Sequence, residues 1–172
     1  MSLKNLLILW FLSALLFSCG YTFQERPAYF KENWRRIYIA PFKNYTQEPE
    51  LGEILAQELR HKFAQGRFLL PVYSEGEADL VLRGEINRIY VEPISYEVFL
   101  QTRERRIQFE GRFQLIDAKT GQKIHENPRL SLSEVYRIQE AATGVLEVGK
   151  IEALRRLSQD LAELIFQEIV FK

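Results

Sequence analysis

The stretch IQFEGRFQL, residues 107–115, decides the fold, because apolar and polar side chains alternate along it. This period of two is typical of a β-strand with one face in a core and the other in water. A helix would need apolar residues three and four positions apart. The stretch therefore predicts an antiparallel sheet with one apolar and one polar face.

The sequence before this stretch predicts a second strand of the same kind. Residues 78–91 alternate between apolar and polar side chains. Glu92-Pro93 predicts a break, because the residue before a proline is conformationally restricted. The alternation resumes over residues 96–100. The apolar face of the first part is expected to contain Leu80, Leu82, Ile86 and Tyr90.

After the stretch, the chain is expected to turn back in a hairpin. Asp117 to Gly121 has the composition of a hairpin connection, and Gly121 is suited to a positive φ. The return strand is expected from Lys123 towards Tyr136. The result is a meander of unusually long strands, which predicts a strongly twisted sheet that projects beyond its helices.

Two segments have the period of amphipathic helices. The first begins at Glu48-Pro49-Glu50, where proline is tolerated and carboxylates are favoured, and it ends at Gly66. The second closes the chain. The apolar stripe of the first helix consists of Leu51, Ile54, Leu55, Leu59 and Phe63, and that of the second of Ile151, Leu154, Leu157, Leu161, Leu164, Ile165 and Ile169.

The order of elements predicts the fold class. A strand at 36–42, a helix, a short strand at 68–73, the meander and a helix follow one another. Both helical stripes are buried if they cover the apolar side of the sheet. We predict an α+β fold, a two-layer sandwich with a mostly antiparallel or mixed four- to five-stranded sheet and two helices packed on one face. This single domain is expected over residues 34–172, and the polar face of its sheet is free to meet solvent or a partner.

The N-terminal residues predict export. Residues 1–18 carry one lysine and then an apolar run. This run is too short to span a bilayer, which needs about 20 residues, and is typical of a secretory signal. Its end, Leu16-Phe17-Ser18-Cys19, resembles the lipobox of bacterial lipoproteins, with Phe17 in place of the smaller residue usual at that position.

The lipobox resemblance implies that Cys19, the only cysteine, carries a diacylglycerol after cleavage. A thiolate is the nucleophile that such an alkylation needs. Residues 1–18 would then be a lipoprotein signal peptide and residues 19–33 a lipidated tether. The alternatives are an ordinary signal peptide followed by a free cysteine, and an uncleaved anchor.

Charge and motifs exclude several classes of function. Removal of residues 1–18 takes away one basic residue and leaves a net charge of −1, which argues against nucleic-acid binding. His61 and His125 have no second histidine or cysteine at ligand spacing, so no metal site is predicted. Glu75 and Glu77 flank a glycine in a loop and are expected to be solvated. We therefore predict no catalytic residue, no enzyme activity and no cofactor other than the lipid on Cys19.

Residues 102–106, TRERR, form a charge cluster between two strands of the predicted meander. Such clusters are mostly solvated surface. The alternative hypothesis is a site for anionic head groups, because guanidinium groups match the geometry of phosphate oxygens. The residues of that hypothetical site are Arg103, Arg105 and Arg106.

Four stretches together resemble one protein family. Each of them is individually a common strand or turn pattern, but their order behind a lipobox is more specific. The resemblance is to the LptE-type lipopolysaccharide-assembly lipoproteins of the bacterial outer membrane. The stretches are Cys19 to Phe23, Ile37 to Thr46, Ala78 to Tyr96, and Glu152 to Ala162.

This resemblance implies a plug inside an LptD-type outer-membrane β-barrel, which helps the barrel to assemble and binds lipopolysaccharide on its way to the outer leaflet. Arg103, Arg105 and Arg106 would then be a lipopolysaccharide-binding site. The protein would be anchored in the outer membrane by its lipid, facing the periplasm or the barrel lumen, because Gly20 is not the aspartate that retains lipoproteins in the inner membrane. The alternative is another periplasmic lipoprotein, a pilotin-like assembly factor that binds protein and no lipopolysaccharide.

Overall fold

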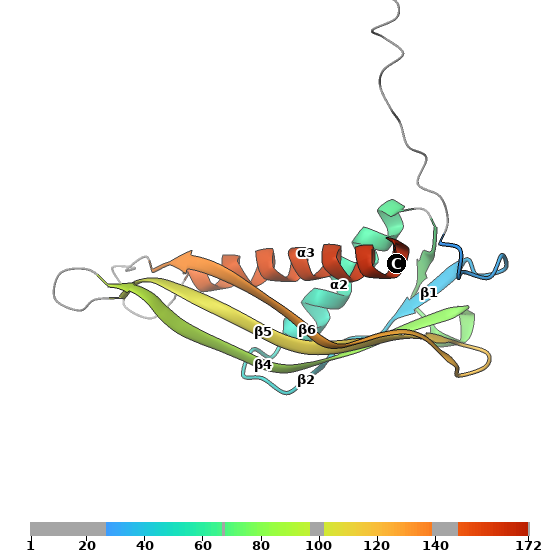
Figure 1. Cartoon of the computed structure of the whole chain (residues 1–172), viewed down its shortest axis with the longest axis horizontal. Coiled ribbons are helices and arrows are strands. Elements are labelled where there is room, and N and C mark those ends of the chain that lie inside the picture. Colours follow the sequence, from blue (N-terminus) through green and yellow to red (C-terminus); the bar gives the residue numbers. More distant parts are fainter. Residues whose placement is uncertain (1–26, 67, 97–101, 139–147, 172) are drawn as a thin grey trace, which may run out of the picture.

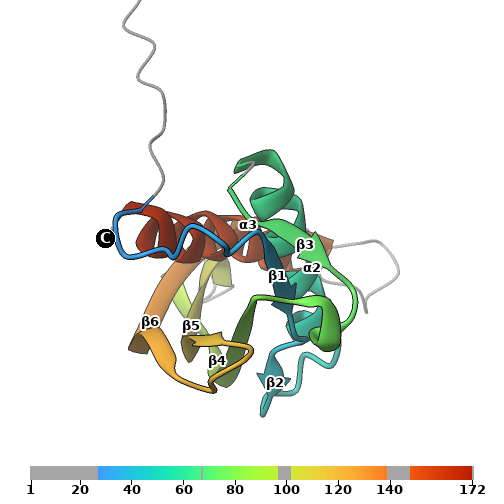
Figure 2. The same cartoon turned by 90° about the vertical axis from the view of Figure 1, so that its right-hand side faces the viewer.

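The computed structural model describes residues 27–66, 68–96, 102–138 and 148–171. Two helices lie on one face of a single sheet, so the predicted two-layer α+β sandwich is confirmed (Figures 1 and 2). The elements in chain order are β1 (Arg36–Ile39), β2 (Lys43–Asn44), α2 (Leu51–Gly66), β3 (Leu70–Val72), the 3-10 helix η1 (Glu75–Glu77), β4 (Leu80–Tyr96), β5 (Thr102–Asp117), β6 (Lys123–Arg137) and α3 (Val148–Phe171).

The sheet is mixed and has six strands, slightly more than the four or five predicted. Its order is β3-β1-β4-β5-β6, and β2 pairs with β4 further along the same side as β1. The pairs that involve β1 and β2 are parallel, whereas β4, β5 and β6 form the predicted antiparallel meander. The sequence did not predict β2 because two residues are too few for a periodic signal.

β4 is one continuous strand of 17 residues, so the break predicted at Glu92-Pro93 is wrong. The strand passes through Pro93 with a register irregularity between Pro93 and Ser95, and pairing with β5 continues to Tyr96. A bulge therefore absorbs the proline without ending the strand. The resumed alternation predicted for residues 96–100 falls almost entirely outside the described residues.

A second irregularity in β4 reverses the faces of its distal half. Ile86 and Arg88 pair with consecutive residues of β5, so Asn87 is the extra residue of a bulge. Beyond the bulge, Ile89 and Val91 pack against the hydrophobic core. Tyr90, predicted on the apolar face, is 37% exposed instead.

The two helices cover the apolar face of the sheet. α2 ends at Gly66 as predicted and begins at Leu51. In α3, Ile151 and Leu164 of the predicted stripe are exposed, whereas Phe166 is buried. The stripe is rotated because α3 packs against α2 as well as the sheet: the rings of Phe63 and Phe166 meet edge to face with centroids 5.0 Å apart.

Residues 27–35, which we call the strap, cross the end of the sandwich next to the C-terminal end of α3 (Figure 2). Phe30 and Trp34 are 6% and 3% exposed and belong to the core. The Tyr29 hydroxyl donates a hydrogen bond to the carbonyl oxygen of Ile169. Residues 27–33, the described part of the predicted tether, thus pack against the domain.

The molecule has two unlike ends. We call the end that holds the strap, β1, β3 and the β5–β6 hairpin the compact end. Beyond Ile86 of β4, the described strands of the sheet are only β4, β5 and β6, and we call this part the projecting end (Figure 1). The long strands thus extend past the other strands.

Candidate functional site

The sheet face that the helices leave uncovered, the open face, carries cross-strand ion pairs. Arg112 Nη2 lies 2.6 Å from Glu85 Oε2, and Arg106 Nη1 lies 3.0 Å from Glu92 Oε1. Side chains directly opposite on one face of antiparallel strands are near neighbours, and exposed pairs of this kind contribute about 0–1 kcal/mol each. The open face is therefore polar and nearly balanced in charge, and it contributes little to the core.

A groove of about 470 Å³ lies on the open face near the compact end. More cations than carboxylates line it, although Arg112 and Lys123 are paired with the lining glutamates and Arg83 is paired with Glu75. The volume and the excess of cations in the lining therefore suit the binding of an anionic group. Its charged lining residues are Lys43, Arg83, Glu85, Arg112, Lys123 and Glu126.

The structure places the arginine cluster inside β5 rather than between two strands, because β5 already begins at Thr102. Arg105 pairs in register with the buried Tyr136 and alternates with Ile107, so its side chain starts on the helix-covered face. Arg106 lies on the open face, where it pairs with Glu92. The cluster is thus divided between the two faces of the sheet.

The three arginines do not form one described site. The side chain of Arg103 lies outside the part of the structure that is described. The Glu92 carboxylate accepts hydrogen bonds from both Arg106 and Gln108, at 3.0 Å each. Alternation along a strand separates neighbouring residues, so a run of charges in the sequence does not predict a cluster on one surface.

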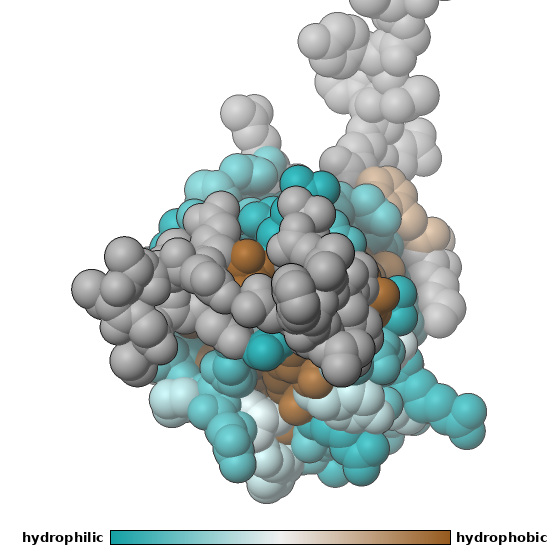
Figure 3. Space-filling view, turned by 90° about the vertical axis from the view of Figure 1, so that its left-hand side faces the viewer, coloured by the Kyte–Doolittle hydropathy of each residue, from teal (hydrophilic) through white to brown (hydrophobic). Residues whose placement is uncertain are grey.

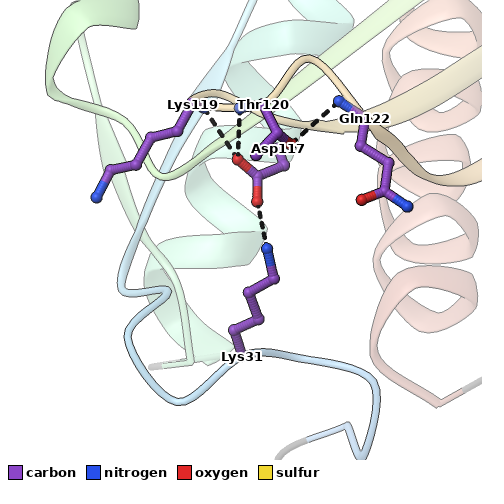
Figure 4. A network of polar contacts seen from close by, with 5 residues as sticks. All are labelled: Lys31, Asp117, Lys119, Thr120 and Gln122. Atoms are coloured by element: carbon purple, nitrogen blue, oxygen red, sulfur yellow. Dashed lines mark hydrogen bonds and ion pairs between the residues drawn. The ribbon is translucent and has the colours of Figure 1, made fainter.

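A polar network at the compact end joins the strap to the β5–β6 hairpin (Figure 4). Asp117 is 2% exposed. One of its carboxylate oxygens accepts a hydrogen bond from Lys31 Nζ at 2.8 Å, and the other accepts the backbone N–H groups of Lys119 and Thr120 at 2.9 and 3.1 Å. These donors lower the pKa of Asp117 to about 2, the hydrogen bond from Lys31 being the largest cause. The predicted hairpin is confirmed, with Gly121 at φ +70°.

A second buried carboxylate, Asp79, holds the last residue of the strap. Its Oδ2 atom accepts the backbone N–H groups of Arg35 and Arg36 at 2.9 and 3.0 Å. Sequence reasoning missed this role of Asp79 and the docking of the strap. The available signal was the aromatic content of the strap, because Tyr29, Phe30 and Trp34 are unusual in a solvated tether.

The two histidines lie apart. His61 on α2 contacts Gln65 at 2.7 Å, and His125 on β6 contacts Glu168 of α3 at 3.0 Å. Among the described residues, no three histidine, cysteine, aspartate or glutamate side chains are grouped closely enough to hold a metal ion. None of the helices within the described ranges has the length and apolarity to cross a membrane. Cys19 lies outside these ranges.

Comparison with known proteins assigns the chain to a protein family. The sequence matches the lipopolysaccharide-assembly family LptE over residues 34–169, most of the chain. The chain belongs to the LptE family. This agrees with the resemblance seen in the sequence. The matched range contains all the strands and nearly all of α3, whereas Cys19 and most of the strap precede it.

Solved structures share the fold of this LptE-family chain. It is similar to an uncharacterized lipoprotein B from Nitrosomonas europaea, with a TM-score of 0.55, 12% identity, and coverage of 87% of this chain and 90% of that one. It is also similar to a putative lipoprotein from Caulobacter crescentus, with a TM-score of 0.52, 16% identity, and coverage of 76% and 85%. A search of curated proteins gives no significant match. At such low identities, the likeness shows the fold alone.

Proposed function

We propose that this LptE-family chain is a non-catalytic outer-membrane lipoprotein, anchored by a lipid on Cys19, that partners an LptD-type β-barrel and binds lipopolysaccharide. The observation that carries the proposal is the family match over residues 34–169. The geometry agrees with it. A plug needs a rigid body that presents polar surface to its surroundings, and the open face offers such a surface without weakening the core.

The first test is recovery of the partner from the native host. Full-length protein with a C-terminal tag is purified from detergent-solubilised outer membranes, and both the bound proteins and the mature N-terminal peptide are analysed by mass spectrometry. The expected result is a large β-barrel in a stoichiometric amount and a mature chain that begins with an acylated Cys19. A Cys19→Ala variant controls for the anchor, because it cannot be acylated at that position.

Other results of this experiment would contradict the proposal. Recovery of a secretion or peptidoglycan component in place of the barrel would favour the pilotin-like class of lipoprotein. An unmodified cysteine in the mature peptide would show that the lipobox interpretation is wrong. One preparation therefore tests the partnership with the barrel and the acylation of Cys19 separately.

We retain Arg103, Arg105 and Arg106 as the proposed lipopolysaccharide-binding residues. All three belong to β5 at the projecting end, and the Arg106 side chain is 40% exposed beside Glu92. Replacement of all three by glutamine should weaken binding to purified lipopolysaccharide about ten-fold or more, because several charge-assisted hydrogen bonds to phosphate are lost.

The matched control removes the same charge elsewhere. Arg35, Lys119 and Arg155 are exposed cations on three other elements, and their replacement by glutamine leaves the β5 cluster intact. If the two triple variants bind lipopolysaccharide with the same affinity, whether or not that affinity is below that of the unchanged protein, the proposal that these arginines form the binding site is wrong. A loss confined to the β5 variant supports it.

A further inference from the structure

The edge of β4 at the projecting end lacks a neighbouring strand among the described elements. β1 pairs with Leu80 to Leu82, and β2 pairs only with Glu85 and Ile86. From Arg88 onward, β4 is paired with β5 alone. In an antiparallel pair, alternate N–H and C=O groups point away from the partner strand, so this edge presents backbone donors and acceptors to its other side.

The unpaired stretch is bounded and has the length of an ordinary strand. The bulge at Asn87 precedes it, and Pro93, which has no N–H group, follows it. The interval between them, Arg88–Glu92, has about the usual strand length of five residues. The opposite edge, β6, is interrupted by Pro128 and a register irregularity nearer the compact end, and its uninterrupted part beyond Leu130 serves as the comparison edge.

A groove of about 450 Å³ runs along this edge. One wall is the loop that follows β2, the other is β4, and Lys150 at the start of α3 completes the lining. Lys150 Nζ reaches Glu48 Oε1 at 2.5 Å, and this ion pair ties the loop to α3. Pairing on this side of β4 ends at Tyr45, whose N–H group donates a hydrogen bond to the carbonyl oxygen of Ile86. The groove begins there and follows the next residues of β4, where a further strand would lie.

The two sides of the groove differ in polarity. On the helix side, Ile89 and Val91 are only partly buried, although they pack against the core. On the open side, Tyr90 is 37% exposed, and the Arg88 guanidinium carbon lies 5.6 Å from the centre of its ring. The Glu48–Lys150 pair is neutral, so Arg88 gives the lining a net positive charge. Figure 3 looks onto this end and shows hydrophobic surface among hydrophilic side chains.

We propose that the β4 edge from Arg88 to Glu92 binds an extended segment of the barrel partner, which adds a strand to the sheet. Backbone hydrogen bonds supply the binding, and alternate apolar side chains of the segment pack on Ile89 and Val91. A carboxylate of the segment lies beside Arg88. This inference rests on the proposed function, because the barrel is the source of the segment.

Hydrogen–deuterium exchange tests the added strand directly. Exchange is compared between the full-length protein in detergent and its purified complex with the barrel. The amides that β4 turns towards the groove between residues 88 and 92 should exchange about ten-fold slower or more in the complex, because slow exchange requires a hydrogen-bonded amide. The internal control is the β6 edge over residues 131–135, which should change less.

The outcomes separate this inference from the proposed function. A complex in which both edges are protected equally, or neither is, overturns the added strand and leaves the barrel partnership intact. Failure to obtain any complex with the barrel overturns the proposed function and this inference with it. Protection of the β4 edge alone supports both.

A substitution in the loop wall provides a second test without altering the strand. Gln47 is exposed and lines the groove, so Gln47→Trp fills the space that the segment needs. The barrel should bind this variant about ten-fold more weakly. The matched control is Gln122→Trp in the exposed hairpin of the compact end, which should bind normally. Equal binding of the two variants would overturn the proposal.

Discussion

The compact and projecting ends use the same three long strands in different ways. At the compact end, the sheet is widened by β1 and β3, and the strap covers it with Phe30 and Trp34. At the projecting end, β4, β5 and β6 continue without those neighbours, and Val135 of β6 is 42% exposed. One strand can therefore contribute to a dense core at one end and to an exposed surface at the other.

This difference has a physical basis in burial. Side chains near the compact end, such as Ile37, Leu80 and Leu82, are fully buried, and each buried aliphatic side chain stabilises the fold by about 1.5–3 kcal/mol. The open face of the projecting end contributes mainly exposed ion pairs, which are much weaker. The helix-covered face is buried at both ends, as Ile107 and Tyr136 show at the projecting end. Stability and surface chemistry are thus concentrated on different faces of the sheet.

The largest expected effect comes from truncation in the core. Leu82→Ala removes a fully buried side chain and should lower the free energy of unfolding by about 2–5 kcal/mol, because the cavity cannot be filled. Val135→Ala at the projecting end should change it by less than about 0.5 kcal/mol. Urea-unfolding curves of both variants measure the contrast. Similar losses in the two variants would contradict the division between the covered and the open face of the sheet.

The next effect comes from a close contact where β4 passes Phe42. A Cβ atom on Gly84 would lie 2.0 Å from the ring of Phe42, which is buried. Gly84→Ala should therefore destabilise the fold by about 1–3 kcal/mol through overpacking. Gly76→Ala is the control, because the nearest atom to its new Cβ is 3.8 Å away. Thermal unfolding of both variants tests the difference, and an unchanged midpoint for Gly84→Ala would show that the ring moves aside freely.

The third effect depends on pH. Asp117→Asn loses the ion pair with Lys31 and should lower the free energy of unfolding by about 1–3 kcal/mol at pH 7. Folding lowers the pKa of Asp117 from 3.8 to about 2, so ionisation favours the folded state. This contribution is complete above about pH 4 and is lost as the pH falls towards 2. Urea-unfolding curves across that range should show the two proteins converging in acid, whereas a constant difference would rule out the carboxylate as the cause.

The smallest effect is expected at the open face. Arg106→Gln breaks an ion pair whose partners are both about 40% exposed, and the free energy of unfolding should change by less than about 0.5 kcal/mol. The same unfolding measurement tests it. A loss above 1 kcal/mol would mean that the open face of the projecting end also contributes to stability, contrary to this comparison.

Periodicity predicted most of the fold because each element has one buried face. The alternation of residues 107–115 places Phe109 and Leu115 in the core, as expected. The prediction of faces from periodicity was wrong where local geometry changes the period. The bulge at Asn87 exchanges the faces of Ile89 and Tyr90, and a single extra residue leaves no signal in an alternating sequence.

The surfaces were harder to predict than the core. A side chain that lies on an exposed face is constrained by its neighbours in space, which are distant in sequence. Arg105 and Arg106 are adjacent in the chain and lie on opposite faces, and the docking of the strap depends on Asp117, 86 residues beyond Lys31. Sequence periodicity carries no information about such pairings.

The strap also determines when the fold can close during synthesis. Tyr29 binds the backbone of Ile169, 140 residues later. A chain that emerges N-terminus first from a ribosome or a translocation channel presents Phe30 and Trp34 long before their binding surface exists. The strap can dock only after the last turns of α3 have emerged, and contacts of such long range form slowly. The strap is thus the first described segment to be synthesised and one of the last that can take its place in the domain.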